Sequence, residues 1–153
     1  MKKASHSSAR QDWMSVLAKA QPDRLIALWR ATSRGEEQRL TWLRAPEIGT
    51  VMVQGRAGGT GEAFNLGEVS VTRCSVQIDA WVGHAYVQGR DKNKARLAAL
   101  CDALLQAEPE TASRINTGII VPLQAEAAKR HAETAAKANA TKVEFYTLVR
   151  GEE

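Results

Sequence analysis

The spacing of hydrophobic residues along the chain predicts helices in four places. Apolar residues recur at helical spacing over residues 11–20 and predict a short amphipathic helix. Pro22 suits the first turn of a second helix, and Asp91 is a good N-cap for the clearest helix, which Pro109 ends. Residues 124–140 are alanine-rich and favour a helix by propensity alone. The apolar face of that helix is thin, so we expect it to contact another subunit.

Alternation of apolar and polar residues with period two predicts the strands of an antiparallel sheet. Pro46 ends the first strand, because proline cannot donate a hydrogen bond to the ladder. Residues 119–123 form an apolar connection. In the longest strand the apolar residues change face near Thr72–Arg73, so we expect a bulge there. The predicted strands are residues 40–45, 50–56, 68–78, 81–88 and 142–150.

The order of these elements predicts a single α+β domain. Its antiparallel sheet has about four to five strands, with helices at the N-terminus, in the centre and before the last strand. The chain of 153 residues is long enough to bury a core of ordinary size. Residues 1–10 are polar and basic, and we expect them to form a disordered tail ahead of a domain that comprises residues 11–153.

The composition is typical of a soluble globular protein, with 44% hydrophobic and 25% charged residues. No apolar run approaches the ~20 residues that a membrane helix requires. The polar N-terminus lacks the apolar segment of a secretory signal. Cys74 and Cys101 fall in a predicted strand and a predicted helix and indicate no disulfide framework. We therefore expect a cytoplasmic protein without membrane contact.

The formal net charge of +4 gives little support to nucleic-acid binding. Part of the excess lies in the basic tail, and aromatic residues, at 5%, are not interleaved with the basic ones. Nucleic-acid binding favours a clustered basic face or aromatic stacking platforms. A small anionic ligand or an acidic partner surface would use the same excess charge.

A glycine-rich stretch is the densest local signal in the sequence. Five of the eleven glycines fall within Gly55–Gly67, between two predicted strands. One interpretation is a hairpin connection, and the other is a concave nest of amides for an anion, with Arg56 and Arg73 nearby. The known phosphate loops do not match, because Glu62 follows Gly61 where a Walker A motif has lysine. Phe64 stands where a dinucleotide motif has its third glycine.

A second polar cluster, Gln88–Lys92, lies where a strand passes into a helix, and helix amides at such a junction attract anions. The alternative is a turn and an N-cap with solvated charges. If the sheet brings both clusters together, their cations and amides would surround one space suited to a polyphosphate or phosphonate. The candidate anion-binding residues are Arg56, Gly58, Gly59, Thr60, Gly61, Glu62, Arg73, Gln88, Gly89, Arg90, Asp91 and Lys92.

No self-sufficient catalytic or metal site is evident in the sequence. His6, His84 and His131 are not at ligand spacing with a cysteine or another histidine, so we expect no metal site. No nucleophile elbow occurs. A Ser-His-Asp or Cys-His group stays open, because such residues need only meet in space. The sequence therefore leaves the catalytic residues unknown.

Five sequence blocks, in order, resemble the G subunit of the bacterial carbon–phosphorus lyase system (the PhnG family). The resemblance runs from about residue 11 to the end of the chain. Glu108–Ile119 and the basic tail are not covered by family motifs. The blocks are Gln11–Ala18, Gly58–Phe64, Val71–Arg73, Tyr86–Lys92 and Phe145–Gly151.

The resemblance implies a small subunit that acts with the H, I and J subunits of a phosphonate-degrading complex, most directly with the I subunit. With these partners, family members support an early step in which an alkylphosphonate displaces adenine from MgATP. The nucleosidase chemistry resembles a property of the I subunit, and carbon–phosphorus cleavage belongs to the radical iron–sulfur J subunit. No cofactor of its own is implied for this chain, and MgATP is a substrate of the complex.

Two hypotheses follow for the role of this chain. It is either a structural subunit that completes the complex without touching substrate, or a contributor whose cations hold triphosphate or phosphonate. In the second case Glu62 would place Mg²⁺ or activate a nucleophile. In either case we expect the chain to be inactive alone. It could also form a homo-oligomer when isolated from its partners.

Overall fold

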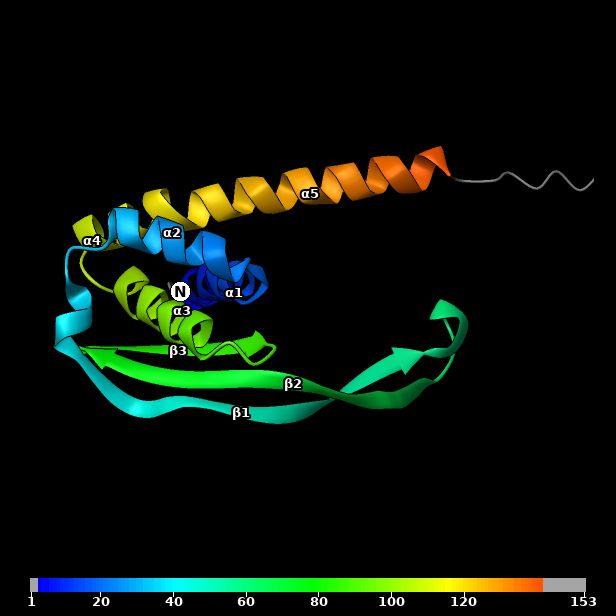
Figure 1. Ribbon diagram of the computed structural model, residues 1–153, viewed down its shortest axis with the longest axis horizontal. Helices are drawn as coiled ribbons and strands as arrows, with labels where there is room; N and C mark the ends of the chain where they lie inside the picture. The colour runs from blue at the N-terminus through cyan, green and yellow to red at the C-terminus, as the bar shows by residue number, and fades with distance from the viewer. Residues whose placement is uncertain (1–2, 142–153) are drawn as a thin grey trace, which may run out of the picture.

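Helices cover one face of a three-stranded antiparallel sheet, so the predicted α+β class is confirmed (Figure 1). The computed structural model describes residues 3–141, with side chains described from residue 9 onward. Within that range the strand order is β1-β2-β3. The strands are β1 (Leu40–Arg56), β2 (Ala63–Ile78) and β3 (Trp81–Gln88), and the helices are α1 (Lys3–Lys19), α2 (Pro22–Thr32), α3 (Lys92–Leu105), α4 (Pro109–Ile115) and α5 (Val121–Ala140).

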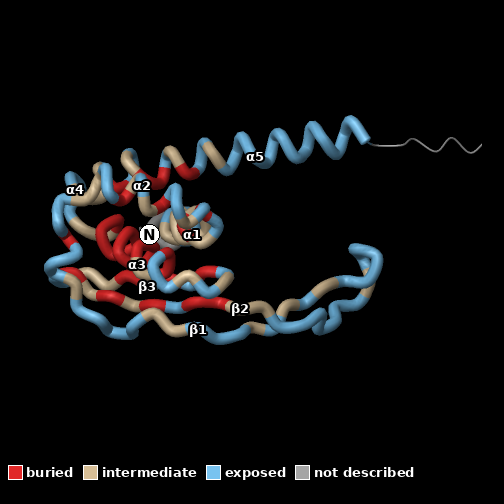
Figure 2. Tube along the Cα trace, in the orientation of Figure 1, coloured by how far each residue is buried: buried red, intermediate tan, exposed pale blue. Residues whose placement is uncertain are grey.

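The core forms around α3, which lies between the sheet and the other helices (Figure 2). All but one of the residues from Lys94 to Leu105 are buried. Alternate residues of β2 and β3 face this helix, because successive side chains of a strand point to opposite faces. Burying each large aliphatic side chain contributes about 1.5–3 kcal/mol. The sheet contributes Cys74, Val76, Ile78, Ala85 and Val87 to this core.

The N-terminal boundary differs from the expectation of a disordered tail over residues 1–10. α1 begins at Lys3 and runs without a break into the predicted helix of residues 11–20. Arg10 lies within the expected tail, yet its guanidinium contacts the buried carboxylate of Asp102, 2.7 Å away. The tail prediction therefore missed a residue that holds α1 against the body.

Two predicted strands, residues 40–45 and 50–56, are one continuous strand, β1. Pro46 interrupts only the ladder: Arg44 pairs with Ser75 and Glu47 with Arg73, so two residues of β1 oppose one of β2. An edge strand tolerates this because proline lacks only the N–H that the ladder would use. The bulge expected near Thr72–Arg73 was thus placed on the wrong strand, since β2 pairs with β3 without a shift.

The described sheet has three strands where about four to five were expected. One was lost by the fusion in β1, and the predicted strand of residues 142–150 lies outside the described residues. The apolar connection expected at residues 119–123 is helical instead. A π-helical turn at Asn116–Ile120 continues directly into α5 and buries Ile119 and Ile120. The run is apolar because these side chains pack into the core.

Beyond the body, β1 and β2 continue as a two-stranded ribbon (Figure 1). Pairing with β3 ends at Val71–Gln88, whereas pairing between β1 and β2 continues to Arg56–Ala63. α5 projects in the same direction, and all of its residues from position 127 to its end are exposed. Within the described residues, neither projection is covered by another element.

We predict that Gly83→Ala destabilises the fold by about 3 kcal/mol or more, because the site has no room for a methyl group. A Cβ at Gly83 would lie 2.0 Å from the Ala99 carbonyl oxygen and 2.6 Å from the Ala103 amide nitrogen of α3. Gly49→Ala is the matched control, since a Cβ there meets nothing within 4 Å. Urea unfolding measures both variants, and equal losses of stability would contradict the packing of β3 on α3.

Candidate functional site

The glycine-rich stretch forms the tip of the ribbon and is closed by its own hydrogen bonds. The Gly61 amide donates to the Ala57 carbonyl at 2.8 Å, and the Arg56 guanidinium donates to the Gly61 carbonyl at 3.2 Å. Gly58 and Gly59 have φ angles of 60° and 82°, which glycine adopts readily. The geometry is that of a hairpin connection, the first of the two interpretations. Arg56 is directed at its own loop.

Arg73 lies on an exposed position of β2 and is engaged in an ion-pair cluster. Its Nε lies 2.5 Å from Oε1 of Glu47, which also pairs with Arg44. Hydrogen bonds from Arg44, and then from Arg73, lower the pKa of the Glu47 carboxyl. The cluster spans the irregular part of the β1–β2 ladder. Arg73 therefore has a local anionic partner already.

The second cluster, Gln88–Lys92, forms the passage from β3 into α3. Asp91 is the predicted N-cap, and its carboxylate accepts a hydrogen bond from the Lys94 amide at 2.8 Å. Gly89, with φ of 95°, donates its amide to the Ser70 carbonyl and accepts from the Thr72 hydroxyl. These bonds hold the turn against β2. Arg90 and Lys92 are exposed beside it.

The fold does not bring the two clusters together. Gln88 pairs with Val71, whereas the glycine-rich tip begins beyond Ala63 on the same strand. At ~3.3 Å per residue, that length of β2 separates them by about 25 Å. The single space surrounded by both sets of cations is therefore a prediction that the geometry does not support.

Four residues of the second cluster, Gln88 to Asp91, instead line an open groove of about 900 Å³ where the ribbon leaves the body, here called the basal groove. The turn between α1 and α2 forms one side, and the four valines of the ribbon contribute its apolar part. Its lining comprises Ala18, Lys19, Ala20, Gln21, Pro22, Val51, Val53, Val69, Val71, Tyr86, Gln88, Gly89, Arg90, Asp91 and Lys94.

Lys94 is a residue of this groove that sequence reasoning missed. It is 7% exposed, and its ammonium donates to the Ala18 carbonyl at 2.7 Å. A cation at the C-terminus of α1 is favourable, because carbonyls there lack helical partners. Burial lowers the pKa of Lys94, and the nearby Asp91 carboxylate opposes that shift. Lys94 shares the helical stripe of Leu97, Ala98 and Cys101, so its periodicity could have revealed its burial.

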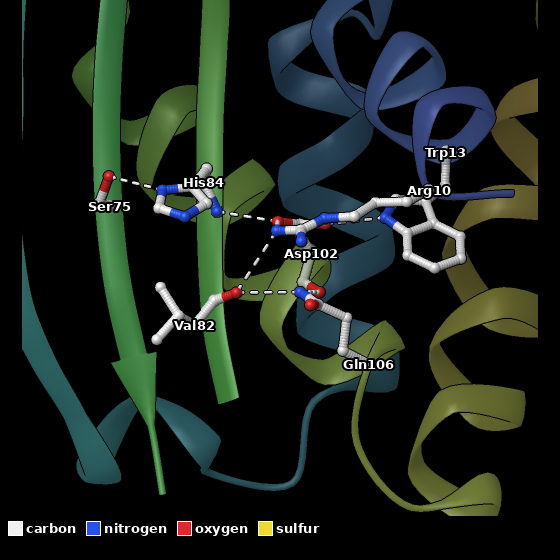
Figure 3. A network of polar contacts seen from close by, with 7 residues as sticks. All are labelled: Arg10, Trp13, Ser75, Val82, His84, Asp102 and Gln106. Carbon is white, nitrogen blue, oxygen red and sulfur yellow. Dashed lines mark hydrogen bonds and ion pairs between the residues drawn. The ribbon is translucent and has the colours of Figure 1, made fainter. Parts of the chain in front are cut away.

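A buried carboxylate, Asp102, joins α3, α1 and the outer edge of β3 (Figure 3). It is fully buried and accepts from Arg10, from the Trp13 indole at 2.9 Å and from the His84 backbone amide at 2.8 Å. The neighbouring Val82 carbonyl accepts from Gln106 at 2.9 Å. Helix side chains thus satisfy edge groups that would otherwise be free to pair with another strand.

Ser75, His84 and Asp102 meet in space but do not form a catalytic triad (Figure 3). The Ser75 hydroxyl lies 2.9 Å from Nδ1 of His84. Asp102, however, contacts the backbone amide of His84 and not its imidazole. A triad requires the carboxylate to hold the second ring nitrogen, which orients the base. The possibility left open by the sequence is not realised in this arrangement.

The cysteines and acidic residues offer no alternative site in the described part of the chain. No group of three or more His, Cys, Asp or Glu residues within residues 3–141 could hold a metal ion. Cys74 and Cys101 are buried, which raises the pKa of the Cys74 thiol to about 11 and that of Cys101 further. No helix in that same range combines the length and apolar character of a membrane span.

Comparison with known proteins identifies the family. The family described as "Phosphonate metabolism protein PhnG" matches residues 8–151. The chain belongs to the PhnG family. The resemblance of the five sequence blocks is thereby confirmed. A relative from Rhizobium meliloti (strain 1021), the alpha-D-ribose 1-methylphosphonate 5-triphosphate synthase subunit PhnG, is 40% identical over 147 residues, which cover 94% of this chain and 90% of the relative.

The PhnG family match spans both candidate clusters and the Asp102 network, so family membership alone does not select among them. The contacts do. Asp102 is saturated by structural partners, and the ribbon tip is closed on itself. The basal groove is the remaining feature in which predicted residues, from Gln88 to Asp91, line an open space.

We predict that Asp102→Ala costs at least about 3 kcal/mol of unfolding free energy. It removes the acceptor of Arg10, Trp13 and the His84 amide at once, and each buried unpaired donor costs about 1–3 kcal/mol. Glu126→Ala is the control, because it breaks an exposed pair with Arg24, worth less than about 1 kcal/mol. Similar losses in both variants, measured by urea unfolding, would refute the role of Asp102.

We also predict that neither cysteine reacts with Ellman's reagent in the native protein at about pH 8, because burial keeps both thiols protonated. Both should react once guanidinium chloride unfolds the chain. Absorbance of the released thiolate measures the reaction. Rapid labelling of Cys74 or Cys101 in the native state would show that a nucleophile had been overlooked.

Proposed function

We propose that this chain is a non-autonomous subunit of the carbon–phosphorus lyase complex. It is needed, with partner subunits, for transfer of the ribose triphosphate moiety of MgATP to an alkylphosphonate, with release of adenine. Its partners are the H, I and J subunits, and the I subunit is in direct contact. The complex works in the cytoplasm, without nucleic acid or membrane, and the chain carries no cofactor of its own. The named function of the relative from Rhizobium meliloti supports this proposal.

The observation that carries the proposal is the uncovered ribbon. Met52, Phe64 and Leu66 on its strands are 52%, 47% and 67% exposed. A two-stranded hairpin is at best marginally stable in water, and large apolar side chains gathered on it favour contact with another protein. The ribbon has the chemistry of a partner-binding arm, and the exposed α5 projects in the same direction (Figure 1).

The lack of a self-sufficient catalytic group among the described residues also supports a dependent subunit. The buried acids Glu36 and Asp102 are both committed to structural contacts with arginines. The cysteines are buried, and within residues 3–141 the ring of His84 hydrogen-bonds to Ser75. A chain built in this way contributes to a transfer reaction through the subunits that it assembles.

We predict that the double variant Phe64→Ser, Leu66→Ser fails to assemble with the sister subunits, because it removes the apolar anchors of the ribbon. Phosphorus NMR of MgATP and methylphosphonate would then show no ribose phosphonate product, although the isolated variant keeps its circular dichroism spectrum. Leu43→Ser is the control, since Leu43 is also exposed, at 52%, but lies at the opposite end of β1. Normal assembly of the double variant would contradict the proposal.

The same assay separates the two roles. Arg73→Ala and Lys92→Ala remove candidate anion contacts without touching the apolar anchors. Loss of product in an intact complex would place these residues at the substrate, so that the subunit contributes to the reaction. Retained turnover per complex would favour the alternative, a purely structural subunit with no contact to substrate.

A further inference from the structure

The basal groove combines an apolar floor with a basic rim. Val51 pairs with Val69 across the ribbon, and Val53 and Val71 extend this apolar strip along the same strands. Three basic residues and one acid line the groove: Lys19, Arg90 and Lys94 against Asp91. The Asp91 carboxylate is occupied by the Lys94 amide, so the rim presents net positive charge to whatever enters.

We infer that the basal groove binds an acidic segment of a partner chain, in which apolar side chains alternate with carboxylates. The inference rests on the proposed function, because the segment belongs to a sister subunit. Apolar side chains of the segment would cover the valine strip, and its carboxylates would meet Arg90 and Lys19. Complementary charge of this kind governs partner choice and register.

The dimensions and chemistry favour a peptide segment over a free phosphate. The groove holds about 900 Å³, far more than one phosphate group fills, and its valines offer nothing to a phosphate oxygen. The cations also come from different elements, Lys19 from the end of α1 and Arg90 from the turn ahead of α3. An extended or helical segment with spaced carboxylates matches that arrangement.

Lys94 adds a buried cation to this site. Its ammonium has three hydrogens, and the hydrogen bond to the Ala18 carbonyl uses one of them. A carboxylate that entered the groove would accept a second hydrogen bond from the same ammonium. Such a charge-assisted bond is roughly twice as strong as a neutral one, so Lys94 would act as the anchor of the segment.

The first test reverses charge on the rim. Arg90→Glu should raise the Kd for the co-purified sister subunits roughly tenfold or more, because it puts a carboxylate opposite the carboxylates of the segment. Arg30→Glu, an equal change of charge on the exposed side of α2, is the matched control and should change Kd less than about threefold. Equal effects of the two variants would overturn the inference.

The second test identifies the occupant. A photo-crosslinking residue at Gln88, which is exposed and lines the groove, is activated in the assembled complex, with Thr41 as the control position. Mass spectrometry should find Gln88 joined to a sister-subunit peptide with carboxylates flanking apolar residues. Crosslinking to a second copy of this chain, to a peptide without carboxylates, or a signal that MgATP abolishes would each overturn the inference.

The outcomes separate this inference from the proposed function. If the unaltered chain forms no complex with the sister subunits and yields no product, the proposed function fails. If the complex forms and turns over, but Gln88 crosslinks no acidic peptide, the basal groove inference alone fails. The apolar anchors of the ribbon tip, Phe64 and Leu66, lie outside the groove. Their variants therefore test the proposed function independently of the basal groove inference.

Discussion

The fold depends on the hydrogen bonds that one buried carboxylate, that of Asp102, receives from the protein. Asp102 lies on the central helix with no access to water, so its oxygens need hydrogen-bond donors from the protein. Arg10 and Trp13 of α1 and the backbone amide of His84 supply them. Because these donors come from elements far apart in sequence, satisfying Asp102 places α1 beside the edge of β3. A buried ion pair is weak evidence of net stability, but it restricts which arrangement can form.

Helix side chains cap the outer edge of β3, whereas the ribbon of β1 and β2 is left uncovered within the described residues. This asymmetry links the fold to its role. Asp102 and Gln106 occupy backbone groups at the outer edge of β3, which keeps that edge from pairing. Within residues 3–141, no strand or helix covers the ribbon of β1 and β2 beyond Val71. The body is thus complete on one side, whereas the projecting ribbon and α5 expose the surfaces that suit assembly into a larger complex.

The contacts of the candidate residues in the folded chain decide which of them can bind an anion. Arg56 and Arg73 are cations in the sequence, but one closes its own loop and the other pairs with Glu47. Lys94 is the opposite case, because it was not among the candidate residues and its side chain is buried beside the groove. Whether a cation can meet a ligand depends on its neighbours in the folded chain, and residue types do not reveal those neighbours.

The sequence by itself determined most of α2, α3 and α5, the strands β2 and β3, and the family, because these depend on periodicity, capping residues such as Asp91 and short blocks of residues. It also predicted the α+β class. Only the tertiary structure decided that Pro46 interrupts a ladder without ending β1, that the two polar clusters lie about 25 Å apart, and that Asp102 is the internal anchor. Each of these depends on pairing between distant segments, and local patterns carry no information on which segments meet.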